Sequence, residues 1–467
     1  MQGQPLSNTD FSSLDLNAGL FENLQTLNYQ VMTPIQAQSL PDILAGKDVI
    51  GQGKTGSGKT AAFGLGLLQK LEVKQFRVQA LILCPTRELA DQVANEIRRL
   101  ARAVQNIKIT TLCGGTPLGP QIKSLKNGAH IVVGTPGRID DHLRKASLNL
   151  EYVDTLVLDE ADRMLEMGFQ ETLDKIIARV PVQRQTLLFS ATFPDEIQRI
   201  VKRIMRDPMM VKVASTHDNS VIRQQFYKVK NEAHRIIALR MLLLQFKPES
   251  SLVFCNTKRE TQEVADQLLA HGFSVLALHG DLEQRDRDQT LIRFSNKSAS
   301  ILVATDVAAR GLDIDGLDAV FNYEIARDPE VHVHRIGRTG RAGSKGLACT
   351  LFTGEEGYKV ALLENALGHN ISPDALPANK VLDERPVQAK MTTLILDGGK
   401  KQKIRPGDIL GALTGDKGID GKQVGKISIT DNRAFVAVER KVANAALNKL
   451  NHGKLKGRSV RARLMRG

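Results

Sequence analysis

The chain has 467 residues, of which 25% are charged and 42% hydrophobic, and a formal net charge of +13. This length exceeds one ordinary core, so we expect two or three domains. The longest apolar runs, such as 241–244, are too short to span a bilayer, and the N-terminus lacks a signal-peptide pattern. We therefore expect a cytoplasmic protein that does not associate with membranes.

The four cysteines are widely separated along the chain and form no C-x-x-C pair. That spacing argues against a zinc site and against a disulfide framework. We expect reduced, mostly buried thiols at Cys84, Cys113, Cys255 and Cys349.

The positive charge is concentrated near the C-terminus. Residues 391–467 hold 17 Lys and Arg but only 6 Asp and Glu, so they carry +11 of the net charge and the first 390 residues carry +2. Such an excess is typical of a nucleic-acid-binding module joined to a nearly neutral enzyme. A solvated basic tail is the alternative.

Short apolar segments alternate with helix-compatible segments over residues 48–213. This alternation predicts right-handed crossovers and a parallel sheet with helices on both faces. The motifs described below follow these segments, at the carboxyl ends of the strands, where open α/β sheets bind ligands. The predicted strands are 48–51, 80–84, 107–112, 130–134, 155–158 and 186–190.

After a polar stretch at 215–220 the alternation begins again, without a second phosphate-binding pattern. Two similar sheets, of which one carries a nucleotide site, suggest a cleft between two domains. Prolines and charged residues interrupt the periodicity at 373–390. The predicted strands of this second unit are 251–254, 275–279, 301–305, 319–322 and 347–352.

The tail is predicted to fold in the order β-α-β-β-α-β, with segments 393–396, 407–413, 424–429, 434–438, 440–450 and 459–464. In the last segment Val460, Ala462 and Leu464 alternate with polar or basic neighbours, which predicts a half-buried strand with a basic outer face. The predicted domains are 1–215, 221–375 and 392–467, joined by linkers 216–220 and 376–391.

Residues 53–60 read Gly-Lys-Thr-Gly-Ser-Gly-Lys-Thr and match the phosphate-loop pattern G-x-x-x-x-G-K-[ST]. Glycines in this pattern let backbone N–H groups wrap phosphate oxygens at the start of a helix. Lys59 is expected to reach the outer phosphates of a nucleotide. The residues expected at the phosphates are Thr55, Gly56, Ser57, Gly58, Lys59 and Thr60.

Asp159 and Glu160 follow the strand-like run 155–158 and provide the acidic partner of this loop. The Thr60 hydroxyl and the Asp159 carboxylate are oxygen ligands suited to Mg²⁺. Glu160 is then left to orient a water molecule. The pair of motifs predicts a nucleotide hydrolase.

Three further motifs extend this pattern: Asp159-Glu160-Ala161-Asp162, Ser190-Ala191-Thr192, and His-Arg-Ile-Gly-Arg-Thr-Gly-Arg at 334–341. Together with the phosphate loop, they make the chain resemble a DEAD-box RNA helicase over about residues 11–365. The resemblance implies an α/β fold class with two tandem RecA-like parallel-sheet domains, and ATP and Mg²⁺ as cofactors.

The resemblance also implies the residues that bind the nucleoside. Tyr29, Thr33 and Gln36 correspond to the adenine site, and a glutamine side chain can both donate to and accept from an adenine edge. Phe11 lies upstream and is either a further contact or a core residue. Asp313 corresponds to the residue that holds the ribose.

Arg338 and Arg341 correspond to arginine fingers that cross the cleft to the γ-phosphate. Hydrolysis would therefore require the two domains to close. His334 corresponds to a residue that links the second domain to Ser190 and Thr192, and so couples the ATP state to strand separation.

RNA contacts in this family come from strand-end loops rich in glycine and hydroxyl residues. Such groups donate to phosphate and 2′-OH oxygens without reading sequence. The corresponding residues are Pro85, Thr86, Arg87, Gly115, Thr135 and Arg138 in the first unit, and Thr257, Gln284, Arg287 and Thr305 in the second.

The tail resembles an RNA recognition motif, with Ala434-Phe435-Val436 at its central strand. Arg433 and Val438 stand where aromatic residues are usual, and Phe435 is the one aromatic residue of the tail. Phosphate-dominated binding of a folded RNA is therefore expected in place of base stacking. The basic residues expected to bind are Lys400, Lys401, Lys403, Arg405, Lys426, Arg433, Lys454, Lys456, Arg458, Arg461 and Arg463.

A DEAD-box core followed by this tail, with its segment 405–413, resembles the bacterial DbpA subfamily. That resemblance implies an ATP-dependent helicase that unwinds short RNA duplexes. Its tail would direct it to hairpin 92 of 23S ribosomal RNA in pre-50S particles during large-subunit assembly. We expect a monomer.

Two other functions compete with this interpretation. An ATP-gated RNA clamp with vestigial hydrolysis is disfavoured because Lys59, Glu160, Arg338 and Arg341 are all present. A DNA helicase is disfavoured by the RNA-type motifs and by the lack of an obvious strand-separating insertion.

Overall fold

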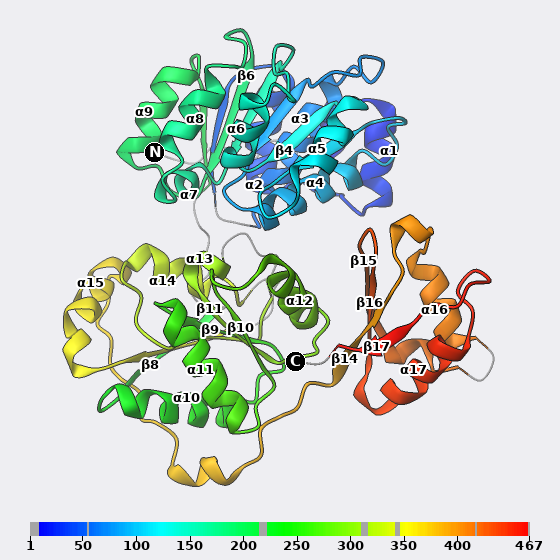
Figure 1. Cartoon of the computed structure of the whole chain (residues 1–467). Coiled ribbons are helices and arrows are strands. Elements are labelled where there is room, and N and C mark those ends of the chain that lie inside the picture. Colours follow the sequence, from blue (N-terminus) through cyan, green and yellow to red (C-terminus); the bar gives the residue numbers. More distant parts are fainter. Residues whose placement is uncertain are drawn as a thin grey trace. The chain divides into compact units, whose positions relative to one another are not determined.

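The computed structural model describes residues 9–53, 56–213, 222–309, 316–340, 346–415 and 418–465 (Figure 1). These residues form two compact units, one comprising the described residues up to 213 and the other those from 222 onward. The second unit contains two sheets, so the chain has three sheets in all among its described residues. No helix in the described ranges is long and apolar enough to cross a membrane.

The first unit is built on a seven-stranded parallel sheet in the order β3-β4-β2-β5-β6-β1-β7. Its strands are β1 (Val49–Gln52), β2 (Ala80–Leu83), β3 (Ile109–Leu112), β4 (Ile131–Gly134), β5 (Thr155–Asp159), β6 (Gln185–Ser190) and β7 (Met209–Lys212). Its helices are α1 (Ala18–Thr26), α2 (Pro34–Leu44), α3 (Lys59–Lys70), α4 (Arg87–Leu100), α5 (Leu118–Lys126), α6 (Pro136–Arg144), α7 (Ala161–Glu166), α8 (Gln170–Ile177) and α9 (Asp195–Ile204).

Helices cover both faces of this sheet, which explains why β2 and β4 are apolar throughout and why β5 has an apolar centre. Along β5, Val157 packs into the cluster shared with α1–α4, whereas Leu156 and Leu158 pack into the cluster shared with α6–α9. Successive side chains of a strand point to opposite faces, so a sheet covered twice needs an uninterrupted apolar run. The parallel-sheet prediction is confirmed.

The second unit begins with a six-stranded parallel sheet in the order β10-β11-β9-β12-β13-β8. Its strands are β8 (Ile222–Lys228), β9 (Ser251–Cys255), β10 (Val275–Leu278), β11 (Ile301–Thr305), β12 (Ala319–Asn322) and β13 (Gly346–Phe352). Its helices are α10 (Glu232–Phe246), α11 (Lys258–Ala270), α12 (Gln284–Ser295), α13 (Asp306–Ala309), α14 (Pro329–Ile336) and α15 (Gly357–Leu367).

The tail forms a four-stranded antiparallel sheet in the order β15-β16-β14-β17, drawn in orange to red in Figure 1. One face packs on two helices through Leu394, Val436 and Leu450, which confirms the predicted small α+β domain. Its elements are β14 (Met391–Leu396), α16 (Pro406–Thr414), β15 (Val424–Ile429), β16 (Ala434–Glu439), α17 (Ala443–His452) and β17 (Ala462–Leu464).

The structure differs from the sequence-based elements at three strands. The strands β7 and β8 were not among the predicted segments, because β7 buries a single residue and β8 contains polar Arg223, Gln224 and Gln225. The last strand was predicted to begin at 459 but begins at Ala462, since the chain turns at Leu455 and Arg458 just before it. All four cysteines are free and buried, as expected.

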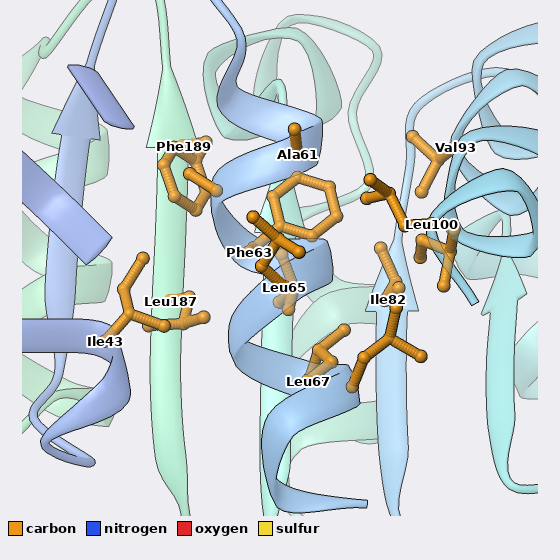
Figure 2. Packing of buried hydrophobic residues seen from close by; sticks show 14 of the residues in the cluster. Ile43, Ala61, Phe63, Leu65, Leu67, Ile82, Val93, Leu100, Leu187 and Phe189 are labelled. Atoms are coloured by element: carbon orange, nitrogen blue, oxygen red, sulfur yellow. The ribbon is translucent and has the colours of Figure 1, made fainter. Parts of the chain in front are cut away.

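The helix α3 lies at the centre of the first unit and carries the residues that follow the phosphate loop. Its Phe63 is fully buried and its ring centroid is 5.4 Å from that of Phe189 on β6. Figure 2 shows the side chains of α3 packed between those of β6 and α4, where Leu100 also contributes. Burial of this helix fixes the start of α3 relative to the strand ends.

Phe63→Ala is expected to destabilise the first unit by about 3–5 kcal/mol, because it removes a fully buried ring from a tightly packed cluster. Differential scanning calorimetry of the full chain would measure the loss as a lower melting temperature. Phe76→Ala is a matched control, since Phe76 is 60% exposed and its truncation should cost far less. Equal effects of the two substitutions would contradict this packing.

Candidate nucleotide and RNA site

The phosphate loop connects β1 to α3 and lies against the predicted adenine residues. Gln36 accepts from the Thr33 backbone N–H at 2.9 Å and donates to the Gly58 carbonyl at 3.1 Å. Gly58 has φ +94°, and a Cβ there would lie 2.6 Å from Gln36 Nε2 and 2.8 Å from Thr33 Oγ1. Glycine is therefore required both for the backbone conformation and for space.

Lys59 and Asp159 are both buried beside this loop. The Lys59 ammonium donates to the Gly53 carbonyl at 2.6 Å, and the Gly53 N–H donates to the Ser190 carbonyl at 3.0 Å. Burial raises the pKa of Asp159 to about 7, although the charge of Lys59 opposes that rise. Thr60 lies in the first turn of α3. Thr55 lies outside the described residues.

A hydrogen-bonded link joins the ends of β5 and β6. The Asp162 carboxylate accepts from the Thr192 N–H at 2.9 Å and from its hydroxyl at 3.0 Å, and the Asp162 N–H donates to Ser190 Oγ at 3.3 Å. These bonds hold the pKa of Asp162 below its usual value in spite of burial. Sequence reasoning gave Asp162 no role, because its partners are about thirty residues away in the chain.

Phe11 packs in the core of the first unit. Phe11 is 1% exposed, belongs to the cluster around α3, and meets the Tyr29 ring edge-on with centroids 6.0 Å apart. Tyr29 is partly buried, and its hydroxyl donates to Glu96 at 2.7 Å while the Arg99 guanidinium lies over the ring. Phe11 thus packs against the Tyr29 ring and helps to fix its position.

The strand order divides the carboxyl edge of the first sheet into two halves. The phosphate loop and the segments 159–162 and 190–192 follow β1, β5 and β6, which are adjacent. The segments predicted to bind RNA follow β2, β3 and β4, which are also adjacent. The chain order does not reveal this separation, because β1 comes before β2, β3 and β4 in the sequence whereas its sheet neighbours β5 and β6 come after them.

The predicted RNA residues of the first unit, except Gly115, lie at or next to helix N-termini. Thr86 caps α4 by accepting from the Leu89 N–H at 3.2 Å, and Thr135 occupies the same position before α6. Arg138 donates to the Thr116 carbonyl and ties α6 to the loop after β3, which contains Gly115. The N-terminus of a helix is a natural site for phosphate.

The second sheet repeats this arrangement. The strands β10, β11 and β9 are adjacent, and they lead to Gln284, Thr305 and Thr257 respectively. Thr257 caps α11 by accepting from the Glu260 N–H, and Arg287 of α12 donates to the Ala308 carbonyl at 2.8 Å. The predicted RNA residues of this unit therefore lie along one continuous part of the edge.

Arg335 holds this edge together, a role that the sequence interpretation missed. Its guanidinium makes two bonds of 2.7 Å to the Asp306 carboxylate and one of 2.8 Å to Asn256 Oδ1. It is 1% exposed, so this bidentate pair is shielded from water. The network joins the loops after β9 and β11 to α14.

Two of the remaining residues predicted for the ATP site or its coupling lie in or just after α14. His334 lies in the last turn of α14, and Arg338 follows the helix, where its carbonyl accepts from the Leu317 N–H at 3.2 Å. Arg341 and Asp313 lie outside the described residues. Among the residues that are described, no cluster of three or more His, Cys, Asp or Glu side chains could hold a metal.

The tail places eight of the eleven basic residues predicted to bind RNA at one end of its sheet. The Lys400 and Lys401 N–H groups donate to the 430–431 turn at 2.9 Å, and the Lys456 ammonium donates to the Lys403 carbonyl at 2.8 Å. Three loops are thereby brought together, and we call this surface the basic end. It comprises Lys400, Lys401, Lys403, Arg405, Arg433, Lys454, Lys456 and Arg458.

The other predicted tail residues lie away from the basic end. Arg463 on β17 pairs with Asp397 at 2.6 Å, and Arg461 just before it is exposed. The Lys426 ammonium on β15 donates to Ser295 Oγ.

Comparison with known proteins agrees with this geometry. Residues 33–200 match the DEAD/DEAH box helicase family, residues 234–343 match the helicase conserved C-terminal domain, and residues 393–464 match the DbpA RNA binding domain. The chain belongs to the DEAD-box family of ATP-dependent RNA helicases. Its C-terminal RNA-binding domain makes it a helicase of the DbpA type.

Similar proteins cover most of the chain. The ATP-dependent RNA helicase DbpA of Escherichia coli K12 is 54% identical over 98% of this chain and 100% of its own length. The CshA helicase of Geobacillus kaustophilus is 47% identical over 74% of each chain. Solved structures include Mss116p bound to single-stranded RNA and AMP-PNP, with a TM-score of 0.73 and 28% identity over 82% of both chains.

A structure of Dbp5 from S. cerevisiae, bound to RNA and ADP BeF3, is also similar. It has a TM-score of 0.70 and 29% identity, and the match covers 78% of this chain and 96% of that one.

Glu260 and Glu324 form an acidic pair behind the loop after β9. Glu324 accepts from the Asn256 N–H at 3.0 Å. Burial, together with the neighbouring Glu324 carboxyl, raises the pKa of Glu260 well above its usual value. A proton held at Glu260 lets the two carboxyl groups hydrogen-bond each other beneath a loop predicted to bind RNA.

Glu260→Gln is expected to make the protein more stable at pH 8 and to change little near pH 4.5. The raised pKa means that the folded chain retains a proton that the unfolded chain releases, so the stability of the wild type falls as pH rises above 4.5. Glutamine mimics the protonated acid and removes that loss, by about 1 kcal/mol after allowance for the partial exposure of the site.

Melting temperatures measured from pH 4.5 to 8 test this expectation. The control is Glu263→Gln, whose exposed side chain lies on the same helix. An unchanged pH dependence in Glu260→Gln would show that the pair does not share a proton.

Proposed function

We propose that this helicase hydrolyses ATP when RNA and ATP together close its two sheet domains, and that closure locally melts a short RNA duplex. The division of the first sheet edge carries this proposal. One half presents the nucleotide motifs, the other half presents helix N-termini suited to phosphates, and the two halves share one edge. A clamp function does not need the Glu160 carboxylate that stands beside Asp159.

The link from Asp162 to Thr192 supports coupling between nucleotide and RNA. It ties the segment after β5, which contains Asp159 and Glu160, to the segment after β6, where His334 of the second domain is proposed to bind. A change at the phosphates therefore moves both segments together. Arg338 and Arg341 are proposed to complete the site and to stabilise charge in the transition state.

Mg²⁺ is proposed to bind at Thr60 and Asp159. The two oxygen donors flank the phosphate loop, one from the first turn of α3 and one from the end of β5. Mg²⁺ commonly keeps several waters and phosphate oxygens and needs few protein ligands, so this donor set fits. When bound, the ion neutralises charge on the phosphates.

We propose that the tail directs the enzyme to hairpin 92 of 23S ribosomal RNA, in pre-50S particles in the cytoplasm. The match to the DbpA RNA binding domain and the 54% identity to the Escherichia coli helicase support a shared target. The basic end supplies lysines and arginines from three adjoining loops, and such a surface suits the phosphates of a folded RNA.

Steady-state ATPase activity tests the proposed function. The rate is compared with the hairpin 92 fragment, an unrelated structured RNA, and DNA of the hairpin sequence. Strong stimulation by the hairpin alone is expected. Equal stimulation by unrelated RNA would contradict the target while leaving the RNA-dependent ATPase intact, and stimulation by DNA would contradict the RNA preference itself.

Glu160→Gln is expected to lower multiple-turnover ATPase by at least about 100-fold and to prolong the RNA complex formed with ATP. The reason is that the carboxylate orients the attacking water, whereas ATP and RNA binding do not need its charge. Dissociation of fluorescent RNA measures the lifetime of the complex. Glu171→Gln, at an exposed position on α8, is the control and should behave as wild type.

Replacing Lys400 and Lys403 by Gln is expected to weaken hairpin binding and to reduce the slope of log affinity against log salt by about 2. The cause is the loss of two phosphate contacts at the basic end. Fluorescence anisotropy at salt concentrations from about 50 to about 300 mM measures both the affinity for the hairpin and the slope.

The matched control replaces Lys422 and Lys441, which are exposed at the opposite end of the tail sheet, by Gln. If the control lowers the slope as much as the basic-end variant does, the tail attracts RNA by net charge alone.

A further inference from the structure

The outer face of the tail sheet is covered by the second sheet domain. Ile395 and Phe435 are partners in register on this face and are each 4% exposed. With Met465 they form a separate apolar cluster, against which Ile292 of α12 packs. Phe435, the one aromatic residue of the tail, is therefore occupied by a protein contact.

A buried polar cluster fixes the orientation of this contact. Thr393 is 1% exposed, and its hydroxyl lies 2.7 Å from Ser298 Oγ and accepts from Asn296 Nδ2 at 3.1 Å. A shift of either surface would leave these groups buried without partners, which costs more than the bonds contribute. The cluster therefore favours one docked arrangement.

Polar contacts at the rim continue the same interface. The Lys426 ammonium donates to Ser295 at the end of α12, and Gln388 donates to the Gly272 carbonyl at 2.8 Å. Lys390 pairs with Glu249. Contacts of this kind add little affinity individually but exclude slipped arrangements.

The helix α12 contributes both to this interface and to the carboxyl edge of the second sheet, where the predicted RNA residues lie; we call this part of the sheet the RNA edge. It begins at Gln284, carries Arg287 in its first turn, and ends at Ser295 beside the tail. A helix of this length is a rigid rod of about 18 Å. The residues proposed to meet RNA in the second domain and the surface that holds the tail are thus parts of one element.

We propose that the outer face of the tail sheet is an internal docking surface and that α12 acts as a rigid spacer between the tail and the RNA edge of the second domain. The tail grips a structured RNA through its basic end, and α12 sets where the neighbouring RNA enters. This inference rests on the proposed function. In a usual RNA recognition motif this face of the sheet stacks on bases. Here the same face holds the tail in position on the second domain.

The test disrupts the interface from each side. Thr393→Arg and Ser298→Arg each place a charge in the buried polar cluster, whereas the packed core of the tail lies on the other face of its sheet. Thr393→Ser retains the hydroxyl and is the matched control. Single-molecule fluorescence transfer between dyes at Arg259→Cys and Asn448→Cys reports docking, because both positions are exposed and the native cysteines are buried.

Wild type and Thr393→Ser are expected to give one narrow distribution of transfer efficiency, and both arginine variants a broad one. Affinity for the hairpin 92 fragment should stay within about twofold, because the basic end is intact. ATPase stimulation by a hairpin extended with a duplex should fall at least about fivefold, because the tethered RNA no longer has a fixed position. Stimulation by unstructured RNA should not change.

A narrow distribution in both arginine variants would overturn the proposal, as would loss of hairpin affinity in Thr393→Arg alone, which would mark the sheet face as an RNA surface. Normal stimulation in spite of undocking would overturn the spacer role. Should the wild type show no RNA stimulation at all, the proposed function fails, and the transfer measurement still decides whether the tail is docked.

Discussion

The parallel register of the first sheet is the constraint on which the rest of the enzyme depends. Because Gln52 pairs with Ser190 and Asp159 with Phe189, the strands β1, β5 and β6 end together. Each of these strands leads to one part of the candidate site: the phosphate loop, the acidic residues 159–160, or the segment 190–192. These parts are therefore neighbours, and no long loop is needed to bring them together. The hydrogen bonds that Thr192 donates to the Asp162 carboxylate only complete an arrangement that the strand ends already impose.

Motifs and apolar runs allowed most of the fold to be predicted from sequence, and they identified the candidate nucleotide site. A doubly covered strand needs a continuous apolar run, so β2, β4 and β5 were visible, whereas the edge strand β7 and the polar β8 were not. The order of the strands within the sheet was also not predicted, because the sequence does not show how many strands each helical connection crosses. Without it, the separation of the candidate nucleotide and RNA residues into two halves of the edge could not be recognised.

The sequence analysis also missed the roles of residues whose partners are distant in the sequence. Arg335 and Asp162 stand inside recognised motifs, yet their roles come from Asp306 and Thr192, which only the fold brings close. The sequence suggested that Phe435 does not stack on bases, since aromatic partners are lacking. It could not show that Phe435 instead packs against α12, because nothing in the local pattern of a strand identifies its cover.

The boundary between the two halves of the first edge falls between β2 and β5, where Leu83 pairs with Leu158. Adjacent strands are about 4.8 Å apart, so the candidate nucleotide and RNA residues are separated by a single strand spacing. Under the proposed function, a change at the nucleotide reaches the RNA over this one spacing, which suits local distortion of a strand better than long processive travel along a duplex.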